Sequence, residues 1–168
     1  MTILLVLGGA RSGKSRYALA RAEAMSGDCL FVATAQALDS EMDSRITRHR
    51  AERGDRWRTI EEPIALAAIV QRESRPERIL LIDCLTLWAS NLMMAERDID
   101  EAVAAFVAAL RQARGQVILV ANEVGLGIVP DNVLARRFRD VAGTINQAVA
   151  ACSDEAMFLA AGLPMRLR

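Results

Sequence analysis

Ile3-Leu4-Leu5-Val6-Leu7 leads directly into Gly8-Gly9-Ala10-Arg11-Ser12-Gly13-Lys14-Ser15. A segment with helical character follows, from about Ser15 to Met25. The eight residues fit the pattern G-x-x-x-x-G-K-[ST] at every fixed position, and they lie between a strand and a helix as that pattern requires. This context predicts a phosphate-binding loop at the start of an α/β fold.

The chemistry of such a loop explains its spacing. Glycines let the backbone fold so that its N–H groups point at phosphate oxygens, and the N-terminus of the following helix adds partial positive charge. Lys14 can then reach the outer phosphates, while the hydroxyl of Ser15 can bind a magnesium ion. We therefore expect a nucleoside triphosphate to bind at Gly8, Gly9, Ala10, Arg11, Ser12, Gly13, Lys14 and Ser15. The alternative is a glycine-rich turn that contains Lys-Ser by chance.

Composition limits the class of protein. A chain of 168 residues has the length of one domain, and we expect a single P-loop nucleotide-binding catalytic domain over residues 1–168. Because 52% of the residues are hydrophobic, a disordered chain is excluded. Lys+Arg and Asp+Glu number 21 each, so the net charge gives no argument for a nucleic acid partner.

Two further features concern the compartment. No apolar run reaches about 18 residues, and no signal peptide is evident, so we expect a cytoplasmic protein that does not span a membrane. The three cysteines, Cys29, Cys84 and Cys152, are widely spaced in apolar surroundings. That pattern favours buried thiols in a reducing cytosol over a disulfide framework or a zinc site.

Apolar runs alternate with helical segments along the chain. The predicted strands are 3–7, 29–34, 57–61, 78–83, 116–121, 156–160 and 165–167. The predicted helices are 15–25, 40–54, 63–74, 87–94, 99–114 and 131–151. This alternation favours a mostly parallel sheet flanked by helices, the α/β architecture of the RecA-like P-loop NTPases.

Several polar residues follow these strands. The run Arg78–Asp83 has the usual shape of a Walker B strand, four apolar residues and then an acid that holds magnesium directly or through water. Many buried strands end in Asp, but the complete phosphate loop favours Asp83 as a metal ligand beside Ser15. Thr34 and Glu123 also follow predicted strands. Because ligands bind at the carboxyl ends of parallel strands, these residues are expected to meet in one crevice.

His49 is the single histidine of the chain and lies in a basic segment. On a helix, His49 would project beside Arg45 and Arg53. Cationic neighbours disfavour the protonated imidazole and leave a nitrogen free to attack phosphorus. The residues alone leave two interpretations open, a nucleophilic histidine or a solvated basic helix with an incidental histidine.

Further segments carry a family resemblance. They are Val32–Ala35, Glu41-Met42, Arg45-Ile46 with His49-Arg50, Trp57–Thr59 with Glu61, Asp83–Leu87 with Asn91-Leu92, Asn122–Pro130, Leu134–Asp140, Ala142-Gly143, Asn146-Gln147 and Ala161–Pro164. Together with Gly8–Arg16, they resemble the bifunctional adenosylcobinamide kinase / adenosylcobinamide-phosphate guanylyltransferase family of cobalamin biosynthesis. The resemblance covers nearly the whole chain in order. The segment Asn122–Pro130 and the Gly9-Ala10-Arg11 form of the loop are far more specific than a generic phosphate loop.

The resemblance implies two reactions that use Mg²⁺. One phosphorylates the aminopropanol hydroxyl of adenosylcobinamide with GTP or ATP, and the other transfers GMP from GTP to adenosylcobinamide phosphate through a covalent phosphoramidate on His49. Lys14 and His49 are then the catalytic residues. The implied GTP contacts are the loop Gly8–Ser15, then Ala33, Thr34 and Ala35, then Arg50, Ala51, Glu52 and Arg53, and finally Glu61 and Asp83. A homotrimer is also implied.

Alternatives stay open at this stage. A monofunctional small-molecule P-loop kinase needs only Lys14, Ser15 and Asp83, with the basic cluster Arg136, Arg137 and Arg139 as a phosphate-clamping lid or as a solvated helix face. A nucleotide-dependent switch module is another alternative, although the N-K-x-D segment of common regulatory GTPases is missing. Trp57 and Trp88 could stack on a base or on the corrin, or could pack in the core. One GTP pose does not obviously serve both reactions, since Lys14 holds terminal phosphates whereas His49 must face the α-phosphate.

Overall fold

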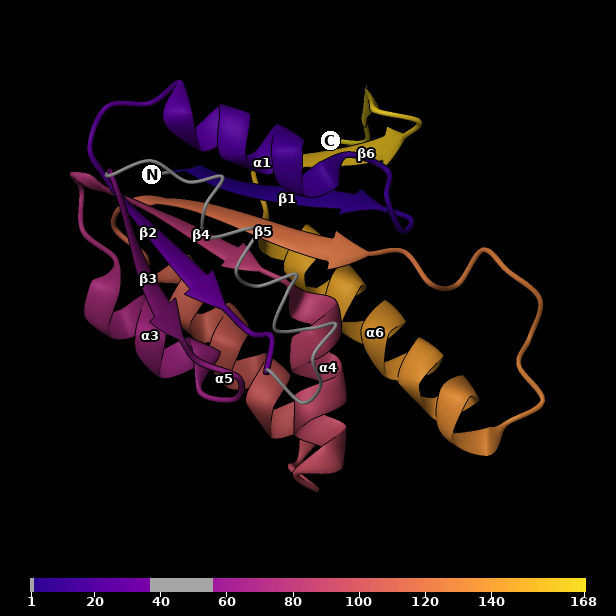
Figure 1. Cartoon of the computed structure of the whole chain (residues 1–168). Helices are drawn as coiled ribbons and strands as arrows, with labels where there is room; N and C mark the ends of the chain where they lie inside the picture. The colour runs from indigo at the N-terminus through magenta and orange to yellow at the C-terminus, as the bar shows by residue number, and fades with distance from the viewer. Residues whose placement is uncertain (1, 37–55) are drawn as a thin grey trace.

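The computed structural model describes residues 2–36 and 56–168, which form a sheet covered by helices (Figure 1). In chain order the elements are β1 (Thr2–Gly8), α1 (Lys14–Glu23), β2 (Asp28–Ala33), β3 (Trp57–Glu61), α3 (Leu66–Glu73), β4 (Arg78–Asp83), α4 (Leu85–Met94), α5 (Ile99–Arg111), β5 (Gln116–Asn122), α6 (Val133–Cys152), β6 (Glu155–Ala160) and β7 (Leu163–Arg166). The helix predicted at 40–54 lies outside the described residues.

The strand order in the seven-stranded sheet is β3-β2-β4-β5-β1-β6-β7. Every pair is parallel except β6 with β7, which is antiparallel. One strand, β5, therefore separates the strand before the phosphate loop from the strand that ends in Asp83, as in RecA-like P-loop proteins. The predicted fold class, a mostly parallel sheet flanked by helices, is confirmed.

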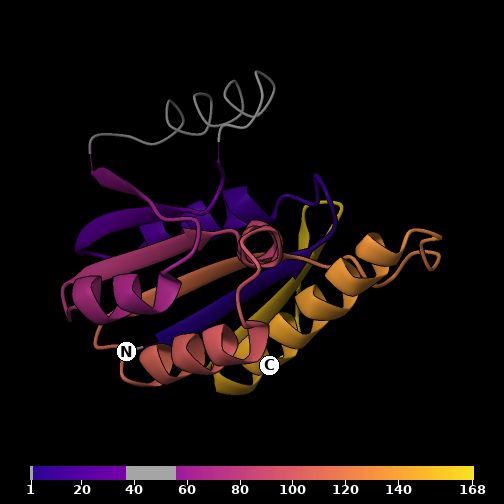
Figure 2. The ribbon, with the colours of Figure 1, turned by 90° about the horizontal axis from the view of Figure 1, so that it is seen from below.

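The sheet is buried on both faces, which explains its continuous apolar runs. Along β1, Ile3, Leu5 and Leu7 pack into the larger core cluster with α3, α4, α5 and α6. Leu4 and Val6 point the other way and pack with Ala18 and Ala22 of α1. Among the helices that the structure describes, α1 is the one on this face of the sheet (Figure 1), and Figure 2 shows the start of α6 and the loop before it projecting beyond the sheet.

Two helices begin later than the sequence pattern predicts, because polar side chains bond N–H groups just before or at the helix start. Glu62 accepts hydrogen bonds from the N–H groups of Ile64 and Ala65 at 2.9 and 2.8 Å, so α3 begins at Leu66 and Pro63 lies in the preceding turn. Asn132 caps α6 by accepting from the Ala135 N–H at 3.1 Å. The helix therefore begins at Val133 and not at residue 131.

The tryptophans and cysteines mainly serve packing. Trp88 is 1% exposed, and its indole N–H donates to the Ile64 carbonyl at 2.8 Å, so core packing is its use. Trp57 is partly buried and meets Phe31 edge to face. The cysteines are free thiols, with Cys29 and Cys84 buried and Cys152 half-buried. In the part of the chain that the structure describes, no helix is both long and apolar enough to cross a membrane.

Candidate nucleotide-binding site

The phosphate loop connects β1 to α1 through left-handed backbone. Gly13 caps α1 with φ of 93°, a conformation that glycine adopts without strain, and Arg11 has φ of 54°. The turn between β6 and β7 is bonded to the loop, since the Gly162 N–H donates a hydrogen bond to the Ser12 carbonyl at 2.9 Å. Gly8 has no room for a side chain, because an added Cβ would lie 2.5 Å from Ser12 Oγ.

The two reactive side chains of the loop stand at the start of α1. Lys14 opens the helix, and its ammonium donates to the Gly9 carbonyl at 3.1 Å, so the charge is held at the loop itself. Ser15 lies in the first turn and is partly buried. Gly9 and Ala10 are at the open part of the loop, and an added Cβ on Gly9 would meet nothing within 4 Å. This arrangement leaves space above the loop for phosphate oxygens at a helix N-terminus.

Three predicted contact residues end neighbouring strands in one row. In the sheet register, Ala33 of β2 pairs with Glu61 of β3 on one side and with Asp83 of β4 on the other. Asp83 is half-buried and Glu61 is exposed. The fold thus brings together carboxylates that are far apart in the sequence, at the same sheet edge as the phosphate loop. The carboxyl ends of parallel strands are where ligands bind in such sheets, so the prediction that these residues contact a nucleotide stays open.

Thr34 fastens the ends of β2 and β4 together. Its fully buried hydroxyl accepts from the Cys84 N–H at 2.7 Å and donates to the Cys84 carbonyl at 2.8 Å. Its backbone N–H donates to the Asp83 carbonyl at 3.2 Å, and Asn91 donates to the Thr34 carbonyl at 2.8 Å. The side chain therefore holds Asp83 in place. Ala35, which follows, is half-buried.

Cys84 follows Asp83 directly but is not a nucleophile. Burial, reinforced by the negative charge of Asp83, raises the pKa of the Cys84 thiol to about 11, although Lys14 acts in the opposite direction. The thiol therefore stays protonated at neutral pH and is chemically quiet. That Asp83 and Lys14 both act on one thiol places their charges in the same neighbourhood.

A cavity of about 460 Å³ lies on the other side of the phosphate loop, toward β5 and β6. Its lining is Gly9, Ala10, Arg11, Ser12, Glu123, Leu126, Phe158, Leu159, Ala160 and Ala161. The sequence pattern singled out Glu123 as a residue after a strand but did not place it among the site residues. The sequence marked the turn after β6 only through the family resemblance of Ala161–Pro164 and did not place it beside the loop, because only the strand order brings them together.

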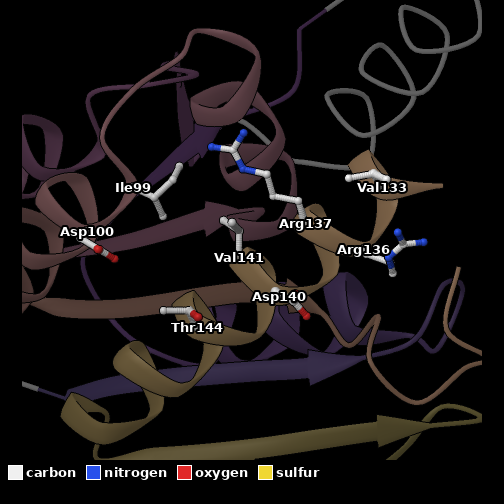
Figure 3. Close-up of a pocket in the computed structure, with 8 residues that line it drawn as sticks. All are labelled: Ile99, Asp100, Val133, Arg136, Arg137, Asp140, Val141 and Thr144. Atoms are coloured by element: carbon white, nitrogen blue, oxygen red, sulfur yellow. The ribbon is translucent and has the colours of Figure 1, made fainter. Parts of the chain in front are cut away.

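A second cavity, of about 400 Å³, lies between the starts of α5 and α6 (Figure 3). It is lined by Ile99, Asp100, Val133, Arg136, Arg137, Asp140, Val141 and Thr144. Two of the three arginines considered as a lid, Arg136 and Arg139, donate hydrogen bonds to the loop between β5 and α6. Arg136 donates to the carbonyls of Pro130 and Asp131 at 2.9 and 2.7 Å, and Arg139 donates to the Gly125 carbonyl. Arg137 lines this second cavity.

His49 and the segment Arg50, Ala51, Glu52 and Arg53 lie outside the described residues. The described site therefore comprises the phosphate loop, the row of strand ends at Ala33, Glu61 and Asp83, and the cavity beside Glu123.

A phosphate loop at a helix N-terminus, beside an acidic strand end in a mostly parallel sheet, defines a P-loop nucleotide-binding protein. Residues 4–167 match the family described as Cobinamide kinase / cobinamide phosphate guanyltransferase. Because the match spans nearly the whole chain, this chain belongs to that family, and the resemblance seen in the sequence is confirmed.

Curated relatives agree with this assignment. The chain is 49% identical over 167 residues to the "Bifunctional adenosylcobalamin biosynthesis protein CobP" of Pseudomonas aeruginosa, covering 98% of this chain and 96% of the relative. It is 40% identical over 184 residues to the "Bifunctional adenosylcobalamin biosynthesis protein CobU" of Salmonella typhimurium, covering 99% of each. Among solved structures, the P4 protein from bacteriophage phi6 in complex with ADP matches 97% of this chain and 52% of that chain, at 15% identity and a TM-score of 0.43.

Proposed function

We propose that this chain catalyses two successive reactions on one corrinoid substrate. It phosphorylates the aminopropanol hydroxyl of adenosylcobinamide with a nucleoside triphosphate, and it then transfers GMP from GTP to that phosphate. The products of the second step are adenosylcobinamide-GDP and pyrophosphate. Family membership supports the pair of reactions. The observation that carries the proposal in the structure is the open phosphate loop, with Lys14 held at the loop and Asp83 on a nearby strand end.

In the kinase step, Lys14 holds the terminal phosphates through its ammonium, and the loop N–H groups bind the remaining phosphate oxygens. Ser15 and Asp83 fit a magnesium ion, since both offer the oxygen ligands that Mg²⁺ prefers. Mg²⁺ keeps several waters and binds few carboxylates. This agrees with the described residues, which hold no cluster of three or more potential metal-binding His, Cys, Asp or Glu side chains. When bound, the ion would neutralise charge on the phosphates.

In the transferase step, an imidazole nitrogen of His49 attacks the α-phosphorus of GTP, and pyrophosphate leaves with the electron pair of the broken bond. A phosphate oxygen of adenosylcobinamide phosphate then attacks the same phosphorus and frees the imidazole. Nucleotide contacts are assigned to Ala33, Thr34 and Ala35, to Arg50, Ala51, Glu52 and Arg53, and to Glu61. For Thr34 the contact is assigned to the backbone, because its hydroxyl is already bonded to Cys84.

Two properties of the whole protein belong to the same proposal. A homotrimer is proposed from the family resemblance, and the exposed apolar residues Leu126, Ile128 and Val129 of the loop after β5 are consistent with an interface. A cytoplasmic location is consistent with the free cysteines. Sedimentation of the purified protein tests the assembly, since a monomeric species at working concentrations would contradict it.

The decisive experiment uses GTP labelled at either the α- or the γ-phosphate. Protein is incubated with magnesium and each nucleotide, denatured, and tested for label that is acid-labile and alkali-stable. We expect label from α-labelled GTP alone, and its loss in His49→Ala. If neither nucleotide labels a protein that still binds GTP, the covalent mechanism is wrong. The chain would then be a kinase or a switch built on the phosphate loop.

A further inference from the structure

The cavity beside the phosphate loop contains a carboxylate that neither proposed step uses. Glu123 follows β5 directly, and β5 is the neighbour of β1 in the sheet (Figure 1). Its N–H donates to the Gly8 carbonyl at 3.1 Å, so its backbone is bonded to the first residue of the phosphate loop. Its side chain lines the same cavity as Gly9–Ser12.

The Glu123 side chain is held in position by its neighbours. One carboxylate oxygen, Oε1, accepts the Gly125 N–H, and the Gly125 carbonyl in turn accepts from Arg139 of α6. Two elements, β5 and α6, therefore fix the turn that carries the carboxylate. A group whose orientation is fixed before the substrate arrives is suited to orienting a nucleophile.

Two buried polar atoms at the loop lack a partner. Ser12 Oγ and Asn122 Oδ1 are buried and make no hydrogen bond within residues 2–36 and 56–168. Ser12 is 7% exposed and lines the cavity, while Asn122 pairs with Gly8 in the sheet register. Burying a hydroxyl without a hydrogen bond costs free energy. The Ser12 Oγ is covered by protein atoms and lies close to Gly8, so it is a feature of the folded loop, and Glu123 is the carboxylate that lines the cavity.

Arg11 also lines the cavity, and the residues other than Arg11, Ser12 and Glu123 are apolar. Phe158, Ala160 and Ala161 form one wall, and Leu126, which is 81% exposed, stands at the rim. A carboxylate beside apolar side chains suits an alcohol on a short aliphatic arm. An aminopropanol group has this chemistry. A nucleoside triphosphate, by contrast, would bring a second cluster of negative charge toward Glu123.

We infer that Glu123 is the general base of the kinase step and that this cavity receives the acceptor alcohol. The inference rests on the proposed function. The hydroxyl proton moves to the Glu123 carboxylate while the alcohol oxygen forms a bond to the γ-phosphorus. The bond from the γ-phosphorus to the β–γ bridging oxygen breaks, and the nucleoside diphosphate leaves with its electron pair.

The other carboxylates at this sheet edge are less suited to the role. Asp83 is already assigned to magnesium. Glu61 ends β3, and β2, β4 and β5 separate that strand from β1. Glu123 lies on the strand adjacent to β1 and shares a cavity with the loop. The strand order and the shared cavity therefore favour Glu123 over Asp83 and Glu61 as the general base.

The test compares Glu123→Gln with Glu77→Gln, which removes the same charge from an exposed residue before β4, at the opposite sheet edge. Phosphorylation is measured with adenosylcobinamide, GTP and Mg²⁺, and guanylyl transfer is measured separately with supplied adenosylcobinamide phosphate. For Glu123→Gln we expect the kinase kcat to fall by about 10²- to 10⁴-fold. Guanylyl transfer and GTP binding should stay within about twofold of wild type, as should every activity of Glu77→Gln.

The pH profile separates a base from a structural residue. The wild-type kinase rate should fall at acid pH as the base becomes protonated, and Glu123→Gln should lose that dependence, while Glu123→Asp keeps it at a reduced rate. A Glu123→Gln enzyme that phosphorylates at a near wild-type rate would overturn the inference, as would equal loss of both reactions together with GTP binding. If the wild type itself performs neither reaction, the proposed function fails instead.

Discussion

The two sides of the phosphate loop are built in opposite ways. Toward β4 and β2, polar groups are bonded to one another, and the Thr34 hydroxyl alone makes two hydrogen bonds to Cys84. Toward β6, the Ser12 hydroxyl is buried with no partner among the described residues, and other atoms of the loop line a cavity. The difference indicates that hydrogen bonds fill the first side, whereas the second leaves open space beside the loop.

The largest expected effect on activity comes from replacing Lys14 of the phosphate loop. Lys14→Ala removes the ammonium that the loop holds against the Gly9 carbonyl. Because that charge stabilises the phosphates in the transition state, kinase kcat should fall by about 10²- to 10³-fold or more. Initial rates with adenosylcobinamide measure the effect, and circular dichroism checks that the variant folds. A Lys14→Ala enzyme with wild-type kinase activity would show that the loop does not bind the reacting phosphates.

An ion-pair cluster lies at the other end of the strands, where β3 and β4 begin. Glu73 of α3 is buried and accepts from Arg72, from Arg58 of β3 at 2.9 Å and from Arg78 of β4 at 2.5 Å. The hydrogen bond from Arg72 and the nearby arginine charges hold the pKa of Glu73 below its usual value, against the effect of burial. Glu73→Gln should lower the free energy of unfolding by about 1.5–3 kcal/mol at pH 7.

The sign of the pH dependence follows from the lowered pKa. The cluster stabilises the fold fully above the unfolded-state pKa of Glu, about 4.3, and loses that contribution as the pH falls through the lower folded-state pKa. Urea unfolding at several pH values should therefore show the gap between wild type and Glu73→Gln closing below about pH 4. Glu77→Gln is the control for lost charge. A gap that stays constant down to pH 2 would contradict this role for Glu73.

Thr34→Val probes the bonded side at the strand ends. The substitution keeps the shape but leaves the Cys84 N–H buried without its acceptor, so the free energy of unfolding should fall by about 1–3 kcal/mol. Thr34→Ser, which keeps the hydroxyl, should recover most of it. Because Thr34 also positions Asp83, the magnesium concentration for half-maximal activity should rise in the valine variant. Equal stability of the valine and serine variants would show that the hydroxyl contributes nothing.

Ser12→Ala is the matching change on the open side, and its effect on stability should be the smallest. The lost hydroxyl has no partner among the described residues, so unfolding free energy should stay within about 0.5 kcal/mol of wild type or rise slightly. The kinase rate should stay within about twofold of wild type, because the covered hydroxyl has no open path to a substrate. Thermal unfolding and kinase assays check both. A loss of stability as large as that of Thr34→Val would break the comparison between the two sides.

The sequence predicted the parts of the site that depend on local chemistry. The glycines, Lys14 and Ser15 form a contiguous motif, and Asp83 ends an apolar run, so both were visible without a structure. The sequence pattern placed the start of this helix at Pro63, but it begins at Leu66. The Glu62 carboxylate accepts hydrogen bonds from the Ile64 and Ala65 N–H groups, and these residues form a turn before the helix. The role of the Thr34 side chain was also hidden, since its partner Cys84 follows another strand, β4, and is far away in the sequence.

By itself, the sequence determined that this chain is a P-loop nucleotide-binding protein of the cobinamide kinase / cobinamide phosphate guanyltransferase family, because motif and strand pattern are local properties. Only the tertiary structure decided which strand ends become neighbours. The register sets Ala33 between Glu61 and Asp83, and the strand order brings Glu123 and the turn after β6 to the same loop. Those contacts depend on hydrogen bonds between distant strands, and no periodicity along the chain specifies their order.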